Sequence, residues 1–304
     1  MKKILLALIA LTAMASVRAQ EIQIYRNNRL IETYTNTANE HYTVKFTDVG
    51  NLDKIEGHEF VLINGLKWAT MNVGATTVAE SKETAYGDFY AWGEIATYYT
   101  KCPTDTGTVT SWKGNNTESH IHGNTYSHNW ICYCGNHNKD NKFYEWAPKP
   151  YDNNILKPEY DVARKSWGGT WRIPTQKDFI NLINACGGYD IKQLPTGITE
   201  PTITEGGIYW VPAGTIIDTF QYDVSGFLFV STVDPNNRVF FPAAGNIQNI
   251  KRYSVATLCT YWSSNIDKTD SPNAHNLYIS STNGITRNSI HSRCNGYSIR
   301  PVSD

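Results

Sequence analysis

One stretch, residues 167–186, specifies a complete helix together with the bend that precedes it (WGGTWRIPTQKDFINLINAC). Thr175 followed three residues later by Asp178 is a capping-box pattern, so we expect a helix to begin at Gln176. The two glycines at 187 and 188 favour the left-handed backbone that ends a helix. Apolar residues at helical spacing predict one buried stripe, made of Phe179, Ile180, Leu182, Ile183 and Cys186.

The bend before this helix is set by glycine and proline. Gly168 and Gly169 permit backbone angles that a side chain disfavours, and Pro174 prevents the bend from continuing as a strand. Trp167 and Trp171 are therefore expected to reach one core from either side of a tight turn.

Seven ordered blocks, spread over about residues 57–304, resemble one known family. The first is WGGTWRIPTQKDF, at residues 167–179. The others are GLKWATMNVGA (65–75), YGDFYAWGE (86–94), LKPEYDVA (156–163), FFPAAG (240–245), YWSSN (261–265) and GYSIRPV (296–302). Together they are similar to the Fibrobacter succinogenes major paralogous domain, a secreted bacterial domain related to the C-type lectin-like fold and of the kind found in exported Bacteroidetes proteins. The resemblance implies an α+β domain at residues 57–304 with two helices and antiparallel sheets, in which the chain ends pair.

The strand and turn pattern also favours an α+β fold. Asn64-Gly65 predicts a hairpin, as do the turn residues at 234–237 and 282–284, and residues 158–167 predict a short helix. Residues 20–56 contain alternating apolar residues around an Asn-Asn turn and are expected to form a small separate β module with its linker.

The amino-terminal residues 1–19 have the pattern of a signal peptide. Lys2 and Lys3 form the basic end, residues 4–15 are apolar, and residues 17–19 offer small side chains for cleavage. The alternative is a buried amino-terminal helix. We expect an exported protein, located at the cell surface, secreted or periplasmic, with no transmembrane segment after cleavage.

Charge excludes two classes of partner. The formal net charge is -1 and the isoelectric point is near 6.7, with no run of Lys and Arg. Nucleic acid and anionic membrane surfaces both require a basic field, so neither is an expected partner.

The six cysteines are disulfide candidates, because an even number in an exported chain favours pairing. They are Cys102, Cys132, Cys134, Cys186, Cys259 and Cys294. A bridge from Cys102 to Cys132 or Cys134 is the first choice, while the full pairing stays open.

Two groups of residues have the chemistry of metal ligands. His120, His122, His128 and His137, interleaved with Cys132 and Cys134, would suit zinc or copper, although bridged cysteines and solvated histidines explain the same residues. Oxygen-bearing residues that would suit calcium are Glu159, Asp161, Asn265, Asp267, Asp270 and Asn273. Capping and turn formation explain most of these residues. Calcium-binding C-type lectins also have a Trp-Asn-Asp run, which is absent here because Trp262 is followed by Ser263. No cofactor is therefore expected.

A binding surface is the preferred functional interpretation. The resemblance implies that the stretch between YWSSN and the last strand is the exposed ligand face, which would recognise a glycan or a protein at the cell surface. Strand alternation places Leu277 and Ile279 inward. The candidate ligand-binding residues are His275, Asn276, Tyr278, Arg287, Asn288, His291 and Arg293.

Other side chains in the blocks are expected to be structural. Trp167, Trp171 and Trp262 are interpreted as core residues, while Arg172 and Arg300 are interpreted as buried partners of carboxylates or of the backbone.

Two other functional classes stay open. One is a metal- or thiol-dependent enzyme related to formylglycine-generating enzymes. The segment Gly296–Arg300 resembles the ending of those enzymes, and Cys294 is the thiol nearest to it in the sequence. The other is a structural subunit of a surface assembly that exchanges strands through residues 21–48. No nucleophile elbow, phosphate loop or HExxH motif is present, so no catalytic residue is assigned.

Overall fold

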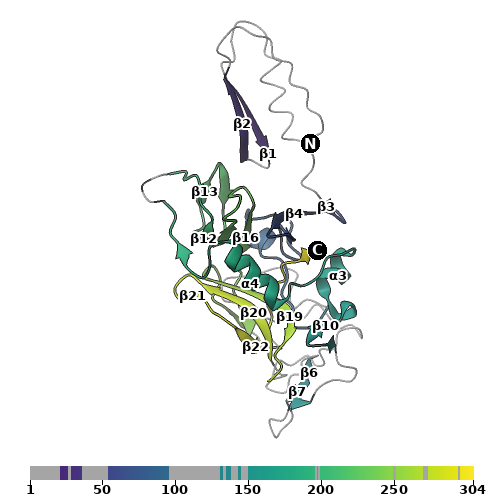
Figure 1. The fold of residues 1–304 in the computed structure, drawn as a ribbon. Helices are drawn as coiled ribbons and strands as arrows, with labels where there is room; N and C mark the ends of the chain where they lie inside the picture. The colour runs from purple at the N-terminus through teal and green to yellow at the C-terminus, as the bar shows by residue number, and fades with distance from the viewer. Residues whose placement is uncertain are drawn as a thin grey trace.

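The computed structural model is rich in β-strands and has few helices in the part of the chain that it describes (Figure 1). The described residues are 21–26, 29–35, 54–95, 131–132, 135–137, 143–144, 150–195, 197, 199–248, 251–269, 273–293 and 295–304. The fold is therefore α+β or mainly β, which agrees with the expected class at that level.

One four-stranded sheet joins the start of the main region to the end of the chain. Its order is β23 (Val302–Ser303), β5 (Leu66–Ala69), β4 (His58–Ile63) and β3 (Lys54–Ile55). The predicted hairpin at Asn64-Gly65 is confirmed, with φ of 51° and 78° at the two turn residues. The sheet begins at Lys54, before the boundary at residue 57 that the sequence suggested.

Helix α4 (Gln176–Ala185) begins at the predicted residue. The backbone N–H of Asp178 donates to Thr175 Oγ1 over 3.1 Å, and the N–H of Thr175 donates to Asp178 Oδ2 over 2.7 Å. This reciprocal capping box is confirmed, and such caps stabilise a helix by about 1 kcal/mol. The helix packs against β19 and β20 through buried residues that include Phe179, while Ile180 is only half-buried.

Two short helical segments precede α4, as predicted for residues 158–167. The 3-10 helix η1 (Pro158–Tyr160) leads into α3 (Val162–Trp167), whose N-cap is Asp161. One carboxylate oxygen of Asp161 accepts the N–H of Arg164 and the other accepts the N–H of Ile173. A further helix, α2 (Lys82–Ala85), is too short to produce a periodic signal in the sequence.

The bend between α3 and α4 has the predicted form. Gly168 and Gly169 have φ of 75° and 55°, and a Cβ at Gly169 would lie 2.8 Å from Glu56 Cγ. Trp167 and Trp171 meet edge to face with ring centroids 5.3 Å apart. Trp171 is fully buried and Trp167 partly so.

A second four-stranded sheet has the order β11 (Ile191–Lys192), β12 (Gly207–Val211), β15 (Gly226–Val230) and β16 (Arg238–Pro242). The hairpin predicted around residues 234–237 joins β15 to β16 and is confirmed. Residues 220–222 belong to a separate hairpin formed by β13 (Thr215–Ile217) and β14 (Phe220–Tyr222).

The third main sheet carries the carboxyl-terminal candidates. Its order is β21 (Gly284–Ile285), β20 (Asn273–Ser280), β19 (Leu258–Ile266), β10 (Ile155–Leu156) and β9 (Tyr151–Asp152), with β22 (Ile290–Ser292) also on β20. The hairpin predicted at residues 282–284 joins β20 to β21 and is confirmed. The pairing of β19 with β20 shifts register between Trp262 and Ile266.

Small sheets complete the described part of the chain. These are β1 (Glu21–Arg26) with β2 (Arg29–Thr35), β17 (Asn246–Gln248) with β18 (Lys251–Tyr253), and β6 (Ile131–Cys132) with β7 (Gly135–His137) and β8 (Phe143–Tyr144). Strands β1 and β2 are antiparallel, with pairs from Glu21 and Thr35 to Arg26 and Arg29. The predicted Asn-Asn turn, residues 27–28, and residues 36–53 of the expected β module lie outside the described residues.

The β11–β12–β15–β16 sheet is covered on both faces. Phe240 and Leu228 face one hydrophobic cluster, whereas Phe227 and Phe241 face a second cluster that also contains the buried side of α4. A third cluster, around Trp262 and α3, lies beneath the carboxyl-terminal sheet. Burial on both faces explains why these strands are near-continuous apolar runs rather than alternating ones.

Of the two arginines expected to be buried, Arg300 is so, whereas Arg172 is half-buried. Arg300 is fully buried and donates from its two terminal nitrogens to the carbonyls of Ala69 and Phe240, each over 2.8 Å. Arg172 forms ion pairs with Asp178 and Asp304. None of the helices in the described part of the chain has the length and apolar run that a bilayer-spanning helix requires.

Candidate functional site

The carboxyl-terminal candidates divide between the two faces of β20. Leu277 and Ile279 are buried as predicted. Alternation along the strand therefore places Asn276 and Tyr278 on the opposite face, where the paired strand β22 contributes His291. We call the face formed by the partly exposed Tyr278 and His291, with Asn276 and Ser289 buried beneath them, the carboxyl-terminal face.

Asn276 lies beneath this face rather than on it, which corrects its assignment as an exposed contact. Asn276 is 7% exposed, and its side chain hydrogen-bonds to four groups: the carbonyls of Ala274 and Ser289, the Ser289 hydroxyl and the His291 ring. Ser289 Oγ donates to Asn276 Oδ1 over 3.0 Å, and the Asn276 amide lies 3.1 Å from His291 Nδ1. Because its polar atoms are used internally, Asn276 orients His291.

His291 links the surface to the core through a series of rings. It stacks on Tyr278 with centroids 5.4 Å apart, and it meets Tyr297 edge to face at 5.8 Å. Tyr297 in turn stacks on the fully buried Trp262 at 4.2 Å. Tyr278 and His291 are partly exposed, so they form the outer end of a rigid aromatic series.

Burial sets the protonation of this face. The pKa of His291 is lowered because burial penalises the charged imidazolium. The His291 imidazole is therefore uncharged at neutral pH, which suits hydrogen bonding to uncharged groups.

His275 lies on the other face of β20. Its Nε2 is 3.5 Å from Asp267 Oδ2, and both side chains are mostly buried. Burial lowers the pKa of His275, and the charge of Asp267 opposes that effect. Alternation along the strand separates it from Tyr278, so the structure does not place these two candidates in one site.

Arg287 and Asn288 are exposed, but each contacts a residue in α4 or just after it. The Arg287 guanidinium lies 4.4 Å from the ring centroid of Tyr189, and Asn288 Oδ1 accepts from Gln176 Nε2 over 3.3 Å. Asn288 has φ of 51°, a backbone conformation that asparagine tolerates better than most residues. These contacts anchor the loop that carries Ser289.

Arg293 is buried, which corrects its assignment as a surface contact. It is 0% exposed, and its guanidinium carbon lies 4.7 Å from the ring centroid of Trp92 and 5.7 Å from that of Tyr151. The side chain is a cation–π element of the core. Strand alternation alone does not predict this, because Arg293 follows the end of β22.

Comparisons with known proteins add no family assignment. The chain matches no protein-family model, no curated protein and no solved structure.

The cysteines that the structure describes are free, so the expectation of disulfides is wrong for Cys186 and Cys259. Both thiols are buried, and burial raises their pKa, in the case of Cys186 to about 12. Cys186 ends the helix stripe, and Cys259 Sγ contacts the Phe241 carbonyl at 3.2 Å. The side chains of Cys102, Cys132, Cys134 and Cys294 lie outside the described residues.

The metal candidates are mostly outside the described residues or engaged elsewhere. His120, His122 and His128 are not described, and neither are Asp270 and the side chain of His137. Asp161 caps α3, and Asn265 Oδ1 accepts the N–H of Gln176. Among the residues that the structure describes, no group of three or more His, Cys, Asp or Glu side chains is placed to hold a metal ion.

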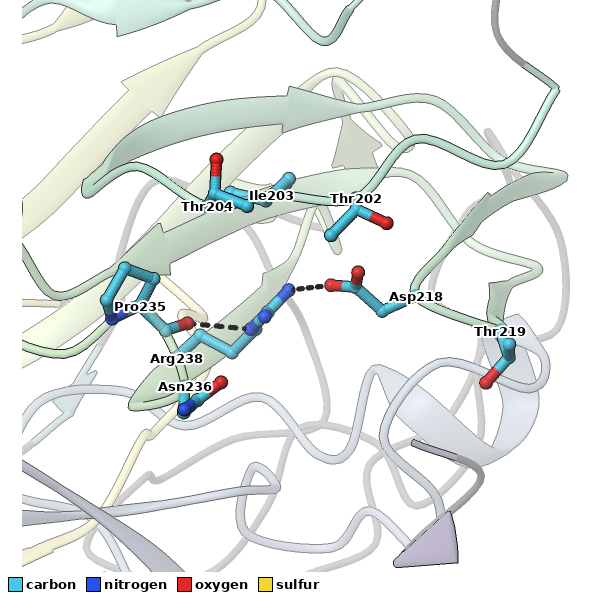
Figure 2. Close-up of a pocket in the computed structure, with 8 residues that line it drawn as sticks. All are labelled: Thr202, Ile203, Thr204, Asp218, Thr219, Pro235, Asn236 and Arg238. Atoms are coloured by element: carbon cyan, nitrogen blue, oxygen red, sulfur yellow. Dashed lines mark hydrogen bonds and ion pairs between the residues drawn. The ribbon is translucent and has the colours of Figure 1, made fainter. Parts of the chain in front are cut away.

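A pocket that the sequence did not indicate lies between three loops (Figure 2). It has a volume of about 440 Å³, and its central feature is an ion pair of 2.5 Å between Arg238 Nη1 and Asp218 Oδ2. The lining residues are Thr202, Ile203, Thr204, Asp218, Thr219, Pro235, Asn236 and Arg238. They come from the segment before β12, the β13–β14 turn and the β15–β16 connection, so no contiguous motif could have revealed them.

Proposed function

We propose that this chain is an exported binding protein in which a C-type lectin-like domain recognises a glycan at the cell surface through the carboxyl-terminal face. The ordered sequence blocks support the fold assignment, and the signal-peptide pattern at residues 1–19 supports export. The β-rich architecture with two mid-chain helices is compatible with that fold.

The observation that carries the proposal is the stack of Tyr278 on His291. Two partly exposed rings, held from below by the buried side chains of Asn276 and Tyr297, form a rigid platform with polar atoms at its edge. Aromatic side chains with few rotatable bonds supply contact area at low entropic cost, which is why binding surfaces are rich in tyrosine.

The composition of the face favours a glycan over a protein. The face presents two partly exposed aromatic rings with polar atoms at their edges, while the buried side chains of Asn276 and Ser289 hydrogen-bond each other beneath the rings. A specific protein–protein interface commonly requires a larger continuous surface with a buried apolar centre. A sugar ring requires only a stacking surface and nearby hydrogen-bonding groups.

The experiment is a glycan array with the full exported chain and two matched tyrosine variants. Tyr278→Ala is expected to abolish the array signal, whereas Tyr253→Ala, which removes an exposed tyrosine on β18, is expected to leave it unchanged. His291→Ala is expected to weaken binding because it removes the ring beneath Tyr278. An array without any signal, or a signal that survives Tyr278→Ala, would contradict the proposal.

The enzyme alternative has no support among the described thiols. Catalysis by cysteine requires an accessible thiolate of lowered pKa, whereas Cys186 and Cys259 are buried and have raised pKa values. Neither thiol is therefore placed to act as a nucleophile.

A further inference from the structure

The pocket around Asp218 and Arg238 is separate from the carboxyl-terminal face and is built by three loops. The β13–β14 turn brings Asp218, the connection between β15 and β16 brings Pro235, and Arg238 begins β16. The third wall is the segment 202–204 before β12. Figure 2 shows Arg238 and Asp218 directed toward each other from opposite sides of the pocket.

The loops are fixed to one another by hydrogen bonds. The N–H of Asp218 donates to the Pro201 carbonyl over 3.3 Å, and Arg238 Nε donates to the Pro235 carbonyl over 3.1 Å. Ile203 is 4% exposed and belongs to the hydrophobic cluster below, so the floor of the pocket is part of the core. The pocket is thus preformed, which lowers the entropic cost of binding a ligand.

The backbone of the turn is strained. Asp218 and Thr219 have φ of 47° and 68°, at the two positions of a hairpin turn where Asn-Gly is preferred. A β-branched residue in this conformation is unfavourable, and such strain is concentrated at functional sites. Here the strained turn holds the Asp218 carboxylate in the pocket.

The ion pair leaves unused hydrogen-bonding capacity on both partners. Arg238 uses Nη1 for Asp218 and Nε for Pro235, so its Nη2 donates to no group in the described part of the chain. Asp218 uses Oδ2, so its Oδ1 likewise accepts no hydrogen bond from the described residues. Both side chains are largely withdrawn from solvent, at 13% and 15% exposure.

The balance of charge identifies the chemical class of ligand. An anion would be attracted by Arg238 but repelled by the adjacent Asp218, and the reverse holds for a cation. A hydroxyl group both donates and accepts, so neighbouring hydroxyls satisfy the free donor and the free acceptor together. The exposed hydroxyls of Thr202 and Thr204 at the rim add groups of the same kind.

We propose that this pocket is a second binding site, specific for a neutral sugar ring with adjacent hydroxyl groups that bridge Asp218 Oδ1 and Arg238 Nη2. The volume of about 440 Å³ falls in the range of small-molecule sites, about 300–1,000 Å³. The site is independent of the carboxyl-terminal face, so either can exist without the other.

The test is a titration of the full chain followed by proton–nitrogen correlation spectra. The probes are the methyl glycosides of glucose, galactose, mannose and N-acetylglucosamine, with inorganic phosphate and ethylammonium as charged probes, each at tens of millimolar. We expect at least one glycoside to shift the amide signals of residues 202–204, 218–219 and 236–238. The charged probes are expected to leave these signals in place.

Two variants test the chemistry without disturbing the fold. Asp218→Asn preserves the turn, because asparagine tolerates positive φ, and removes the charged acceptor. It is expected to weaken binding about tenfold. Thr202→Val removes one exposed hydroxyl at nearly constant shape and is expected to weaken binding about threefold. Asp223→Asn, an exposed carboxylate outside the pocket, is the matched control and is expected to bind as the parent chain does.

Three results would overturn the proposal. The first is the absence of any shift with all four glycosides. The second is glycoside binding that Asp218→Asn and Thr202→Val leave unchanged. The third is a stronger response of the same signals to phosphate or to ethylammonium. Should Asp218→Asn unfold the chain, Thr202→Val alone decides between these outcomes.

Discussion

The guanidinium of Arg300 donates a hydrogen bond of 2.8 Å to the carbonyl of Ala69, a residue 231 positions earlier in the chain. Its second terminal nitrogen donates to the Phe240 carbonyl, and its carbon lies 4.8 Å from the ring centroid of Phe241. One buried cation thereby joins β5, β16 and the carboxyl-terminal segment.

Arg300→Met is expected to lower the free energy of unfolding by about 3 kcal/mol, because two buried carbonyls lose a charged donor. Urea unfolding followed by tryptophan fluorescence measures the change. Arg287→Met is the matched control: this exposed arginine contacts the Tyr189 ring, and its loss should cost less than about 1 kcal/mol. Equal unfolding midpoints for the two variants would refute the structural role of Arg300.

Thr175→Ala is expected to destabilise the protein by about 1 kcal/mol, because it removes the side-chain half of the capping box of α4. The same denaturant titration measures this loss. Thr286→Ala changes an exposed threonine outside the helix and should alter the free energy of unfolding by less than about 0.5 kcal/mol. A Thr175→Ala protein as stable as the parent would show that the cap is not formed.

Stability is expected to decrease as the pH falls from about 7.5 to 5.5. Burial lowers the pKa of His58, His275 and His291 below the ordinary value of 6.5, although Asp267 opposes the shift at His275. The unfolded chain then binds more protons than the folded chain across this window. The stabilisation that these neutral histidines contribute is complete at pH values above their pKa in the unfolded chain. It is lost as the pH falls through that value toward their lower pKa in the folded chain.

The contribution of a single histidine is tested with His291→Gln, measured by urea unfolding at several pH values. The free energy of unfolding of this variant should depend less steeply on pH in that window than that of the parent chain. Parallel curves for parent and variant would mean that His291 does not titrate differently in the folded and unfolded states.

Cys186 and Cys259 are expected to resist alkylation by iodoacetamide at neutral pH in the folded protein and to react after denaturation. Both thiols are buried and have raised pKa values, so access and thiolate formation are each disfavoured. Mass spectrometry of peptides labelled before and after unfolding gives the result. A disulfide-linked peptide containing either cysteine would contradict the structure.

The sequence by itself determined the local features of this protein. The start of α4 at Gln176 and the turn at Asn64-Gly65 follow from capping and from the backbone preferences of a few adjacent residues. The inward direction of Leu277 and Ile279 follows from strand alternation. These features are readable because the groups that cause them are neighbours along the chain.

Only the tertiary structure decided which polar candidates reach the surface. Asn276 lies under His291 and Arg293 lies against Trp92, because burial depends on distant segments that pack over a strand. In the same way, the pairing of Arg238 with Asp218 depends on three loops that are separate in sequence. Such contacts are set by the register and packing of whole sheets, which no short stretch of residues encodes.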